Sequence, residues 1–520
     1  MTLSVNFIHW FIALLPILII LFFMISLRWS GGRAGSLSWL VASGIVLFIF
    51  GASMKLIAVA SLKGLWNTIF IIYIIWGSMA IYNIVDKVGG FRSIASTFTQ
   101  LTGGNRILQL LVLGWAFPSF LQGVCGFGTP VAVAAPLLIG LKFNPIIATI
   151  TALLGHSWAN TFGSLGSSYA AIIKTTGLEP EGIALTASIF LAIVCVFIGL
   201  TICFIYHGLK GLEEGALAAI LLSLTMGITL IISATFISPY LASTLAGLVG
   251  LLVGVFILPK IKWFKVKHFD DKKDDKNINF HIAFAPYYIL IIIVFVVYLS
   301  PLKKLLSVYK IGLPFPQTET AVGFINQAIS SYNPIDFLTT PGTLIFLSVL
   351  LSILYFHFKG LWKIPYSREI ISSVIKQAFP ATLTVMTMSM MASIMVDAGL
   401  TNLLARGTAK FTQHFYPIFS PLIGMLGAFM TGSNTSSNIL FGVFQRDVAN
   451  FLGINAIIVA SLQTTGASLG NAISPLDVAL GAAVSKIHGQ EGTIIKKISL
   501  YVIFMEIIVG FLGYLYLKLN

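Results

Sequence analysis

Two polar segments interrupt long apolar stretches of this chain, and their residue types suit the binding of a small anion. Glycines let backbone N–H groups approach a carboxylate closely, while hydroxyl and amide side chains both donate and accept hydrogen bonds. A carboxylate with a neighbouring hydroxyl needs such a mixture of groups in a small volume. We therefore expect six residues of these segments to bind substrate: Gly126, Gly128, Thr129, Ser433, Asn434 and Thr435.

A second polar break follows each of these segments, at residues 156–168 and 464–475. Non-helical backbone at membrane depth survives only where protein buries it or water reaches it. Broken helices expose N-terminal N–H groups, which favour anions, and unwound carbonyls, which suit a cation. We expect Asn160, Ser468 and Asn471 to join the substrate site. In an alternative interpretation the glycines and serines only allow helices to pack closely, but this explains two corresponding polar clusters poorly.

Ionisable side chains within apolar stretches are costly and are functional candidates by default. We expect proton coupling to involve four candidate groups: His156, Glu506, Asp86 and Asp397. Histidine suits proton exchange because its unperturbed pKa lies near neutrality. Each candidate also has a structural alternative, namely a packed neutral histidine, a protonated buried glutamate, or aspartates that cap the following helix. We expect Asp477 to cap a helix as well, and Arg446 to extend toward the membrane interface.

The whole sequence has the composition of a membrane protein. Of its 520 residues, 57% are hydrophobic and only 9% are charged, whereas a soluble domain has roughly 25% charged residues. A bilayer core requires about 20 apolar residues per helix. The clearest apolar runs are residues 7–26, 65–85, 182–206, 216–237, 239–259 and 282–300, and shorter ones are 36–53, 343–356 and 498–517.

These runs predict helices, because barrel strands would alternate in segments of about 10 residues and a continuous apolar run must satisfy its own backbone. The expected fold is an all-α polytopic membrane protein with about 12–14 membrane segments. The net charge of +14 fits the basic loops of the positive-inside rule rather than nucleic-acid binding. Cys125, Cys195 and Cys203 lack metal-ligand spacing, so we expect no metal, no cofactor and no disulfide.

An internal repeat relates the two halves of the chain. A shift of 311 positions brings Val85-Asp86 onto Val396-Asp397, and it also aligns Asn144, Gly155 and Asn160 with Asn455, Gly466 and Asn471. We therefore expect five parts: membrane helices at 1–84, a first repeat at 85–206, helices with a charged linker at 207–281, helices with a loop at 282–378, and a second repeat with the last membrane helix at 379–520.

Loop charges indicate that the two repeats are inverted. The charged linker at 260–276 and the basic stretch at 359–376 are expected in the cytoplasm, and the loop at 301–340 is expected outside. Asp86 then ends a helix in the cytoplasm, whereas Asp397 ends the equivalent helix outside. Inverted repeats with broken helices and re-entrant hairpins are typical of secondary transporters.

The motifs of the polar segments resemble those of the bacterial and archaeal L-lactate permease family. The resemblance rests on GFGTPVAVAAPL at residues 126–137, TGSNTSSNILFG at 431–442 and GASLGNAISP at 466–475, and it extends over nearly the whole chain. It implies proton-coupled uptake of L-lactate, D-lactate and glycolate. The Ser-Asn-Thr at 433–435 is also similar to the signature of divalent-anion/sodium symporters, which share an inverted-repeat architecture with hairpins.

The predicted function is secondary active co-transport of a small monocarboxylate with protons across the cytoplasmic membrane. A sodium-coupled carboxylate symporter is the alternative, because Ser433, Asn434 and Thr435 could also hold Na⁺. A passive channel and a membrane-embedded enzyme are further alternatives, although the sequence contains no His-Glu-x-x-His and no Cys/His metal spacing. The expected partners are the carboxylate, protons or sodium, and lipid, without nucleic acid. The oligomeric state stays open.

Overall fold

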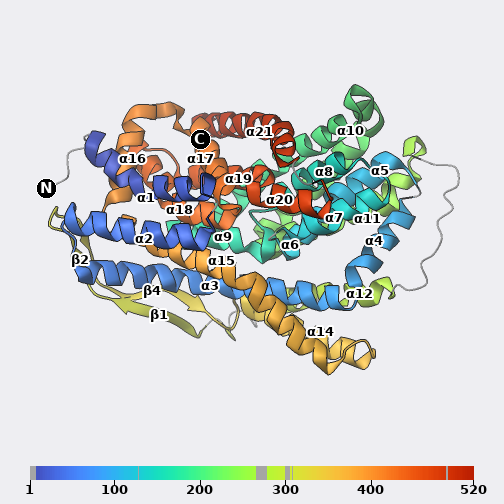
Figure 1. Cartoon of the computed structure of the whole chain (residues 1–520), viewed down its shortest axis with the longest axis horizontal. Coiled ribbons are helices and arrows are strands. Elements are labelled where there is room, and N and C mark those ends of the chain that lie inside the picture. The colour runs from blue at the N-terminus through green and yellow to red at the C-terminus, as the bar shows by residue number, and fades with distance from the viewer. Residues whose placement is uncertain are drawn as a thin grey trace.

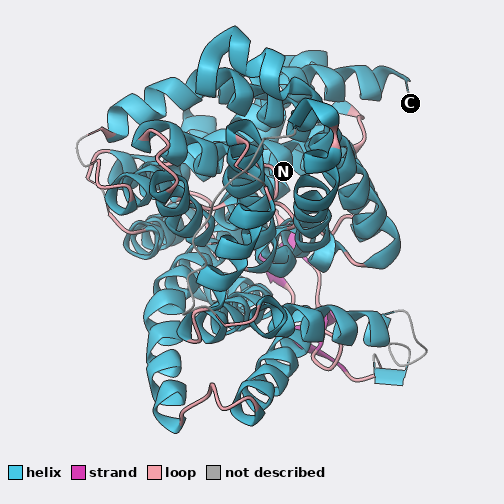
Figure 2. Cartoon of the chain, turned by 90° about the vertical axis from the view of Figure 1, so that its right-hand side faces the viewer, coloured by secondary structure: helices cyan, strands magenta, loops and turns pink. Residues whose placement is uncertain are grey.

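The protein is a multi-pass helical membrane protein. The structure is a computed structural model that describes residues 7–27, 29–102, 104–126, 128–264, 278–298, 305–306, 308–487 and 490–519. Figure 2 shows that helices make up nearly all of the described chain, with a few short strands in its lower half. Nine segments in these ranges are helical, long and apolar enough to cross a membrane. Six of them match apolar runs of the sequence analysis, whereas Arg106–Val124, Ile364–Asp397 and Ala456–Val484 were not among those runs.

The first half of the chain begins with three long helices, and its longest helix is α10. Its elements are α1 (Phe7–Ile25), α2 (Gly31–Phe48), α3 (Met54–Lys87), α4 (Gly90–Leu101), α5 (Arg106–Leu111), the π-helical turn η1 (Val112–Ala116), α6 (Phe117–Val124), α7 (Thr129–Gly140), α8 (Pro145–Ser157), α9 (Gly163–Thr176), α10 (Pro180–Ile232), η2 (Ser233–Ile237), η3 (Pro239–Leu241), α11 (Ala242–Leu252), η4 (Val253–Ile257), η5 (Leu258–Lys260) and η6 (Lys262–Phe264).

The region of α10 contains two membrane passes. Its backbone leaves helical geometry at Gly208, where φ is +63°. A Cβ placed on Gly199 would lie 3.2 Å from the Cβ of Ala219, and one on Gly227 would lie 3.0 Å from the Cβ of Ala192. The two parts of α10 therefore run antiparallel, in agreement with the two separate apolar runs predicted there.

The second half of the chain repeats the order of the first. The helices α2 and α14 have 18 residues each, and α3 and α15 have 34 residues each. The elements of this half are α12 (Phe280–Tyr298), β1 (Lys310–Phe315), β2 (Thr318–Glu319), β3 (Ile325–Asn326), β4 (Ile329–Asp336), α14 (Pro341–Phe358), α15 (Ile364–Asp397), α16 (Leu400–Thr412), η7 (Gln413–Phe415), α17 (Tyr416–Thr431), α18 (Asn434–Leu452), α19 (Ala456–Gly470), η8 (Asn471–Ile473), α20 (Pro475–Val484) and α21 (Glu491–Leu519).

The equivalent helices α3 and α15 pack against each other in opposite directions, as an inverted repeat requires. Lys63 in the first part of α3 bonds to Asp397 at the end of α15. Asn83 near the end of α3 donates to Gln377 in the first part of α15. Figure 1 shows the two helices side by side along the lower part of the molecule. The predicted inversion is thus present within the fold.

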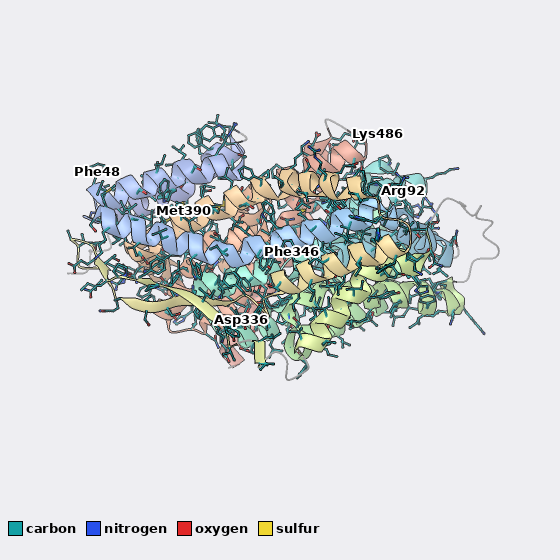
Figure 3. The ribbon with its side chains drawn as sticks, turned by 90° about the horizontal axis from the view of Figure 1, so that it is seen from below. Phe48, Arg92, Asp336, Phe346, Met390 and Lys486 are labelled. Atoms are coloured by element: carbon teal, nitrogen blue, oxygen red, sulfur yellow. The ribbon has the colours of Figure 1, made fainter. Side chains whose placement is uncertain are left out.

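The loop between α12 and α14 contains short strands, which the all-helical prediction did not include. β1 pairs antiparallel with β4, and β2 pairs antiparallel with β3. This ribbon lies along the first half of α3 (Figure 1), where the indole of Trp66 donates to the carbonyl of Asn333 at 3.2 Å. Figure 3 places Phe48 and Arg92, which flank α3, at opposite ends of the molecule. The strands therefore sit toward one end of the long axis.

Each repeat contains a helical hairpin followed by a broken helix. In the first repeat, α5, η1 and α6 form one buried helix, and α7 returns from the tip near Gly128. In the second repeat, α17 and α18 meet at Gly432, which has φ +64° and ends α17. The broken helices are α8 with α9, and α19 with η8 and α20. Asn144 and Asn455 cap α8 and α19 with their side chains, as the repeat predicts.

The returning helix of each hairpin lies beside the broken helix of the other repeat. A Cβ placed on Gly481 of α20 would lie 3.2 Å from Val131 of α7. A Cβ placed on Gly442 of α18 would lie 2.9 Å from Ile172 of α9. The two repeats therefore interlock, and this brings both hairpin tips to the breaks in the helices.

Candidate functional site

The first turn of α9 contains a break in the helical backbone. Ser164, Leu165 and Gly166 have φ values of +46°, +51° and +79°. Left-handed backbone is uncommon for residues other than glycine, and such strain concentrates at functional sites. All three residues are buried, so the surrounding side chains hold this conformation in place.

The break contacts the tip of the first hairpin through Ser164. Its hydroxyl accepts a hydrogen bond from the backbone N–H of Gly126 at 2.8 Å. Gly128 precedes α7 with φ +79°, so only glycine fits there without strain, and Thr129 is the first residue of that helix. The predicted glycines therefore form the turn that positions the N-terminus of α7.

The same break contacts the tip of the second hairpin. The Ser168 and Thr435 hydroxyls lie 2.9 Å apart, and the side-chain amide of Asn434 donates to the Thr161 hydroxyl at 3.2 Å. Ser433 is the N-cap of α18, because its hydroxyl accepts from the N–H of Ser436. The tips of both hairpins thus meet one segment of the first broken helix.

The second broken helix joins this region through Ser468. Its hydroxyl accepts from Asn434 at 3.1 Å and from the backbone N–H of Thr161 at 2.9 Å. The Asn160 amide donates to the Ser468 carbonyl at 3.2 Å. Asn160 and Ser468, which the sequence predicts as site residues, are therefore brought together with the Ser-Asn-Thr tip.

Asn471 lies close to the first hairpin tip. Its amide donates to Asp477 Oδ2 at 2.6 Å, and a Cβ placed on Gly128 would lie 3.8 Å from Asp477 Oδ1. The expectation that Asp477 caps a helix is wrong, because the cap of α20 is the Ser474 hydroxyl, which accepts from the Asp477 N–H. The Asp477 carboxylate instead faces the tip.

The structure adds polar residues that the sequence analysis did not single out. Asn438 lies one turn after Asn434 on α18, and its amide donates to the Thr464 hydroxyl at 2.9 Å. Spacing of four residues on a helix places the two amides on one face, and this signal was present in the sequence. Among the described residues, no partner is found for the side-chain oxygens of Asn438 and Asn471, so the site retains buried acceptors.

Two of the four predicted proton-coupling residues are buried. His156 lies near the first break, and Glu506 lies in the last helix. His156 at the end of α8 is held through Nδ1, which lies 2.8 Å from the Ala152 carbonyl. Glu506 on α21 is 0% exposed, and neither carboxyl oxygen has a hydrogen-bond partner in the described part of the chain. The two residues therefore differ, since one is anchored to its own helix and the other is left unpaired.

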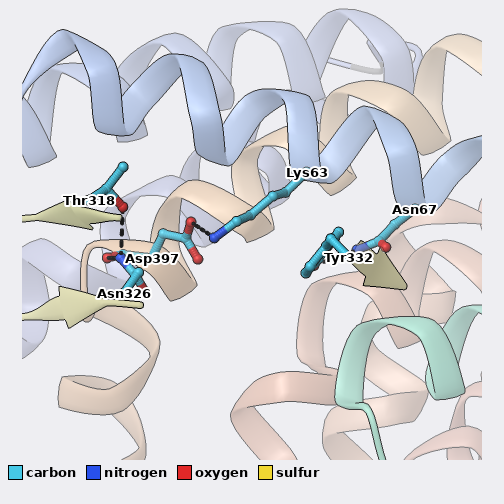
Figure 4. A network of polar contacts seen from close by, with 6 residues as sticks. All are labelled: Lys63, Asn67, Thr318, Asn326, Tyr332 and Asp397. Atoms are coloured by element: carbon cyan, nitrogen blue, oxygen red, sulfur yellow. Dashed lines mark hydrogen bonds and ion pairs between the residues drawn. The ribbon is translucent and has the colours of Figure 1, made fainter. Parts of the chain in front are cut away.

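The other two predicted proton-coupling residues, Asp86 and Asp397, have unequal surroundings although the repeat aligns them. Asp86 is exposed at the end of α3. Asp397 is buried and paired with Lys63 at 2.8 Å (Figure 4). The alternative that Asp397 caps the following helix is wrong, because Gly399 occupies the N-cap position of α16. Sequence analysis missed Lys63, although a lysine inside an apolar helix is itself a signal.

Arg446 is held by hydrogen bonds within the protein. Its guanidinium donates to the Thr176 carbonyl at 2.7 Å and to Asp447 Oδ1 at 2.8 and 2.9 Å. The arginine therefore joins α18 to the end of α9 and is neutralised by its neighbour in sequence. It fixes the helix that carries the Ser-Asn-Thr tip.

The chain is similar to known transporters over nearly its whole length. The family model of L-lactate permease matches residues 9–519. The chain is 28% identical to L-lactate permease of Escherichia coli K12 over 96% of this chain and 94% of that protein. It is 28% identical to L-lactate permease of Halalkalibacterium halodurans, over 94% of this chain and 92% of the relative.

Two further comparisons are more distant. The chain is 25% identical to the glycolate permease GlcA of Escherichia coli K12, over 93% of this chain and 91% of the relative. The solved Alcanivorax borkumensis YdaH transporter has a TM-score of 0.45 and 15% identity, covering 89% of this chain and 87% of that one, which is too low for conclusions. The match of the family model over almost the entire length is decisive, and the chain belongs to the L-lactate permease family.

Proposed function

We propose that this transporter carries L-lactate, D-lactate and glycolate together with protons across the cytoplasmic membrane. The observation that supports this most is the contact of one helix break with both hairpin tips, through Ser164 to Gly126 and through Ser168 to Thr435. A site shared by two inverted repeats is where alternating access requires the substrate to bind. The named L-lactate and glycolate permeases among its relatives support the same substrates.

The polar groups of the two tips suit a 2-hydroxy acid. The N-termini of α7 and α18 supply partial positive charge for a carboxylate, so that no cationic side chain is required. The unpartnered oxygens of Asn438 and Asn471 can accept a hydrogen bond from the neighbouring hydroxyl. We propose that the nine predicted residues at the tips and breaks surround the substrate: Gly126, Gly128, Thr129, Asn160, Ser433, Asn434, Thr435, Ser468 and Asn471.

Of the four predicted proton-coupling groups, Glu506 has the surroundings that best fit a proton carrier. An isolated ionised carboxylate in an apolar interior is very unfavourable. Glu506, which has no hydrogen-bond partner among the described residues, is therefore stable there only when it carries a proton. His156 is the second candidate. Asp397 is neutralised by Lys63 and Asp86 is exposed, so neither needs a proton to stay in place.

Uptake of labelled lactate into proteoliposomes tests the proposal. With an inward proton gradient the vesicles should accumulate lactate, unlabelled glycolate should compete, and a protonophore should abolish accumulation. The same vesicles with a sodium gradient at equal pH test the alternative, because the hydroxyls of the Ser-Asn-Thr tip could also hold Na⁺. Accumulation that survives the protonophore and follows sodium would establish the sodium-coupled symporter instead.

A further inference from the structure

Asp477 is a buried acid at the first hairpin tip, and no described residue forms an ion pair with it. It is 4% exposed, and it lies in the first turn of α20, whose cap is Ser474. The Asp477 carboxylate is therefore not used to cap the helix. Its one side-chain hydrogen bond in the described structure comes from the Asn471 amide at 2.6 Å.

The elements packed against α20 supply no counter-ion. These elements are α7, α8, α17, η8 and α21, and α7 and η8 contain no ionisable residue. None of the described titratable side chains on the other three forms an ion pair with Asp477: His156 on α8, Tyr416 on α17, and Glu491, Lys496, Lys497, Tyr501, Glu506, Tyr514, Tyr516 and Lys518 on α21.

The carboxylate of Asp477 faces the place where a substrate anion is proposed to bind. A Cβ on Gly128 would lie 3.8 Å from Asp477 Oδ1, and α20 is held alongside α7 by the packing of Gly481 against Val131. An anion bound at the N-terminus of α7 would therefore lie within several ångströms of a second carboxylate. Two like charges so close together in a site of low dielectric repel strongly.

We infer that Asp477 couples proton binding to substrate binding, because the neutral acid admits a carboxylate to the first hairpin tip and the ionised acid repels it. This inference rests on the proposed carboxylate transport and adds the residue that links the two ligands. One proton on Asp477 and one lactate anion enter the site together, so the pair adds no net charge. Unlike Glu506, Asp477 lies beside the tip itself.

Asn471 is suited to both protonation states of Asp477. Its N–H group now donates to the carboxylate, while its Oδ1 has no partner among the described residues. A rotation of the amide exchanges donor and acceptor, so Oδ1 can accept the O–H of a protonated Asp477. This exchange of donor and acceptor requires a buried amide with an unused acceptor beside the acid, and Asn471 provides it.

The test is calorimetric titration of the purified full-length protein with lactate between pH 5 and 8, in buffers of different ionisation enthalpy. The wild type should lose affinity as the pH rises, by about tenfold per pH unit above the midpoint, and should take up about one proton per lactate in that range. Asp477→Asn should bind lactate with an affinity that does not depend on pH and should take up no proton. Glu319→Gln, which changes an exposed acid on β2 in the same way, should behave as the wild type.

A second variant guards against loss of folding. Asp477→Glu keeps an ionisable acid, so proton uptake should persist with a shifted midpoint. An Asp477→Asn variant that keeps the wild-type pH dependence would overturn the inference, as would wild-type binding without proton uptake. If the wild type binds neither lactate nor glycolate at any pH, the proposed function itself fails, and the inference fails with it.

Discussion

Two regions of this transporter each contain a buried aspartate, and they treat it differently. Between α3 and α15, Asp397 forms an ion pair with Lys63 at 2.8 Å, beside the ring of Tyr332, which lies 5.7 Å from the lysine (Figure 4). At the first hairpin tip, the Asp477 carboxylate accepts one side-chain hydrogen bond within the described part of the chain, from the Asn471 amide. A neutralised carboxylate contributes to packing between helices, whereas an unpaired one responds to protons and to a nearby anion.

The strand region reinforces the paired aspartate. Asn326 of β3 donates to the Asp397 carbonyl at 2.8 Å and to the Thr318 hydroxyl at 3.2 Å. Asn67 donates to the Tyr332 hydroxyl at 3.1 Å. Figure 4 shows the ion pair between Asn326 and Thr318 on one side and Tyr332 on the other.

Breaking the ion pair should produce the largest effect on stability. Lys63→Met leaves Asp397 buried without its partner, which should lower the free energy of unfolding by about 3–5 kcal/mol. Lys87→Met is the matched control, because it breaks a pair with Glu369 between the same two helices at an exposed position, and this should cost about 0–1 kcal/mol. Thermal unfolding in detergent measures both. Equal losses would show that Asp397 is not specially dependent on its lysine.

Filling the first tip should have the largest effect on transport. Gly128→Val places a β-branched residue at φ +79°. Its Cβ would lie 2.2 Å from the Leu480 side chain. Lactate uptake should fall by more than about hundredfold. Gly453→Val has a similar φ of +65° but no atom within 4 Å of its Cβ, and it should retain most of the uptake. Similar losses of uptake in both variants would show that backbone strain alone causes the effect.

Removing the Asn434 amide at the second tip should have an intermediate effect on the affinity for lactate. Asn434→Ala deletes a side chain that we place against the substrate, and loss of a hydrogen bond to a charged group costs roughly 1.5–3 kcal/mol. The affinity for lactate should fall about tenfold to hundredfold. Asn450→Ala, at an exposed position near the other end of the same helix, is the control. Wild-type affinity in Asn434→Ala would remove the second tip from the site.

Removing one hydroxyl contact between the break and the second tip should have the smallest effect on the affinity for lactate. Ser168→Ala removes the hydroxyl 2.9 Å from Thr435, and a single such bond contributes about 1 kcal/mol, or roughly fivefold in affinity. Ser167→Ala removes a longer contact of 3.4 Å and should change the affinity less. Titration with lactate compares the two variants directly. A larger effect of Ser167 would reverse the assigned order of the contacts.

Local patterns in the sequence were sufficient for most of the membrane helices, for the broken segments and for the repeat, but not for the spans Arg106–Val124, Ile364–Asp397 and Ala456–Val484. Continuous apolar runs predict spans because each helix satisfies its own backbone in lipid. The repeat aligned Asn144 with Asn455, and the structure shows that both cap a helix. The break at residues 156–168 was also visible, because glycine, serine and amide side chains disfavour a continuous helix there.

Only the tertiary structure decided which of these residues meet. Lys63 lies 334 positions from Asp397, and Thr161 lies 307 positions from Ser468, so neither contact is encoded in local spacing. The position of Asp477 beside Gly128 depends on the interlocking of α20 with α7 from different repeats. The sequence by itself determined where the chain crosses the membrane and where it breaks, because those properties depend on the solvent and on neighbouring residues. Packing of the two inverted repeats decided which buried acid is neutralised and which is left to respond to protons, because a charge is compensated by whatever lies nearest in space.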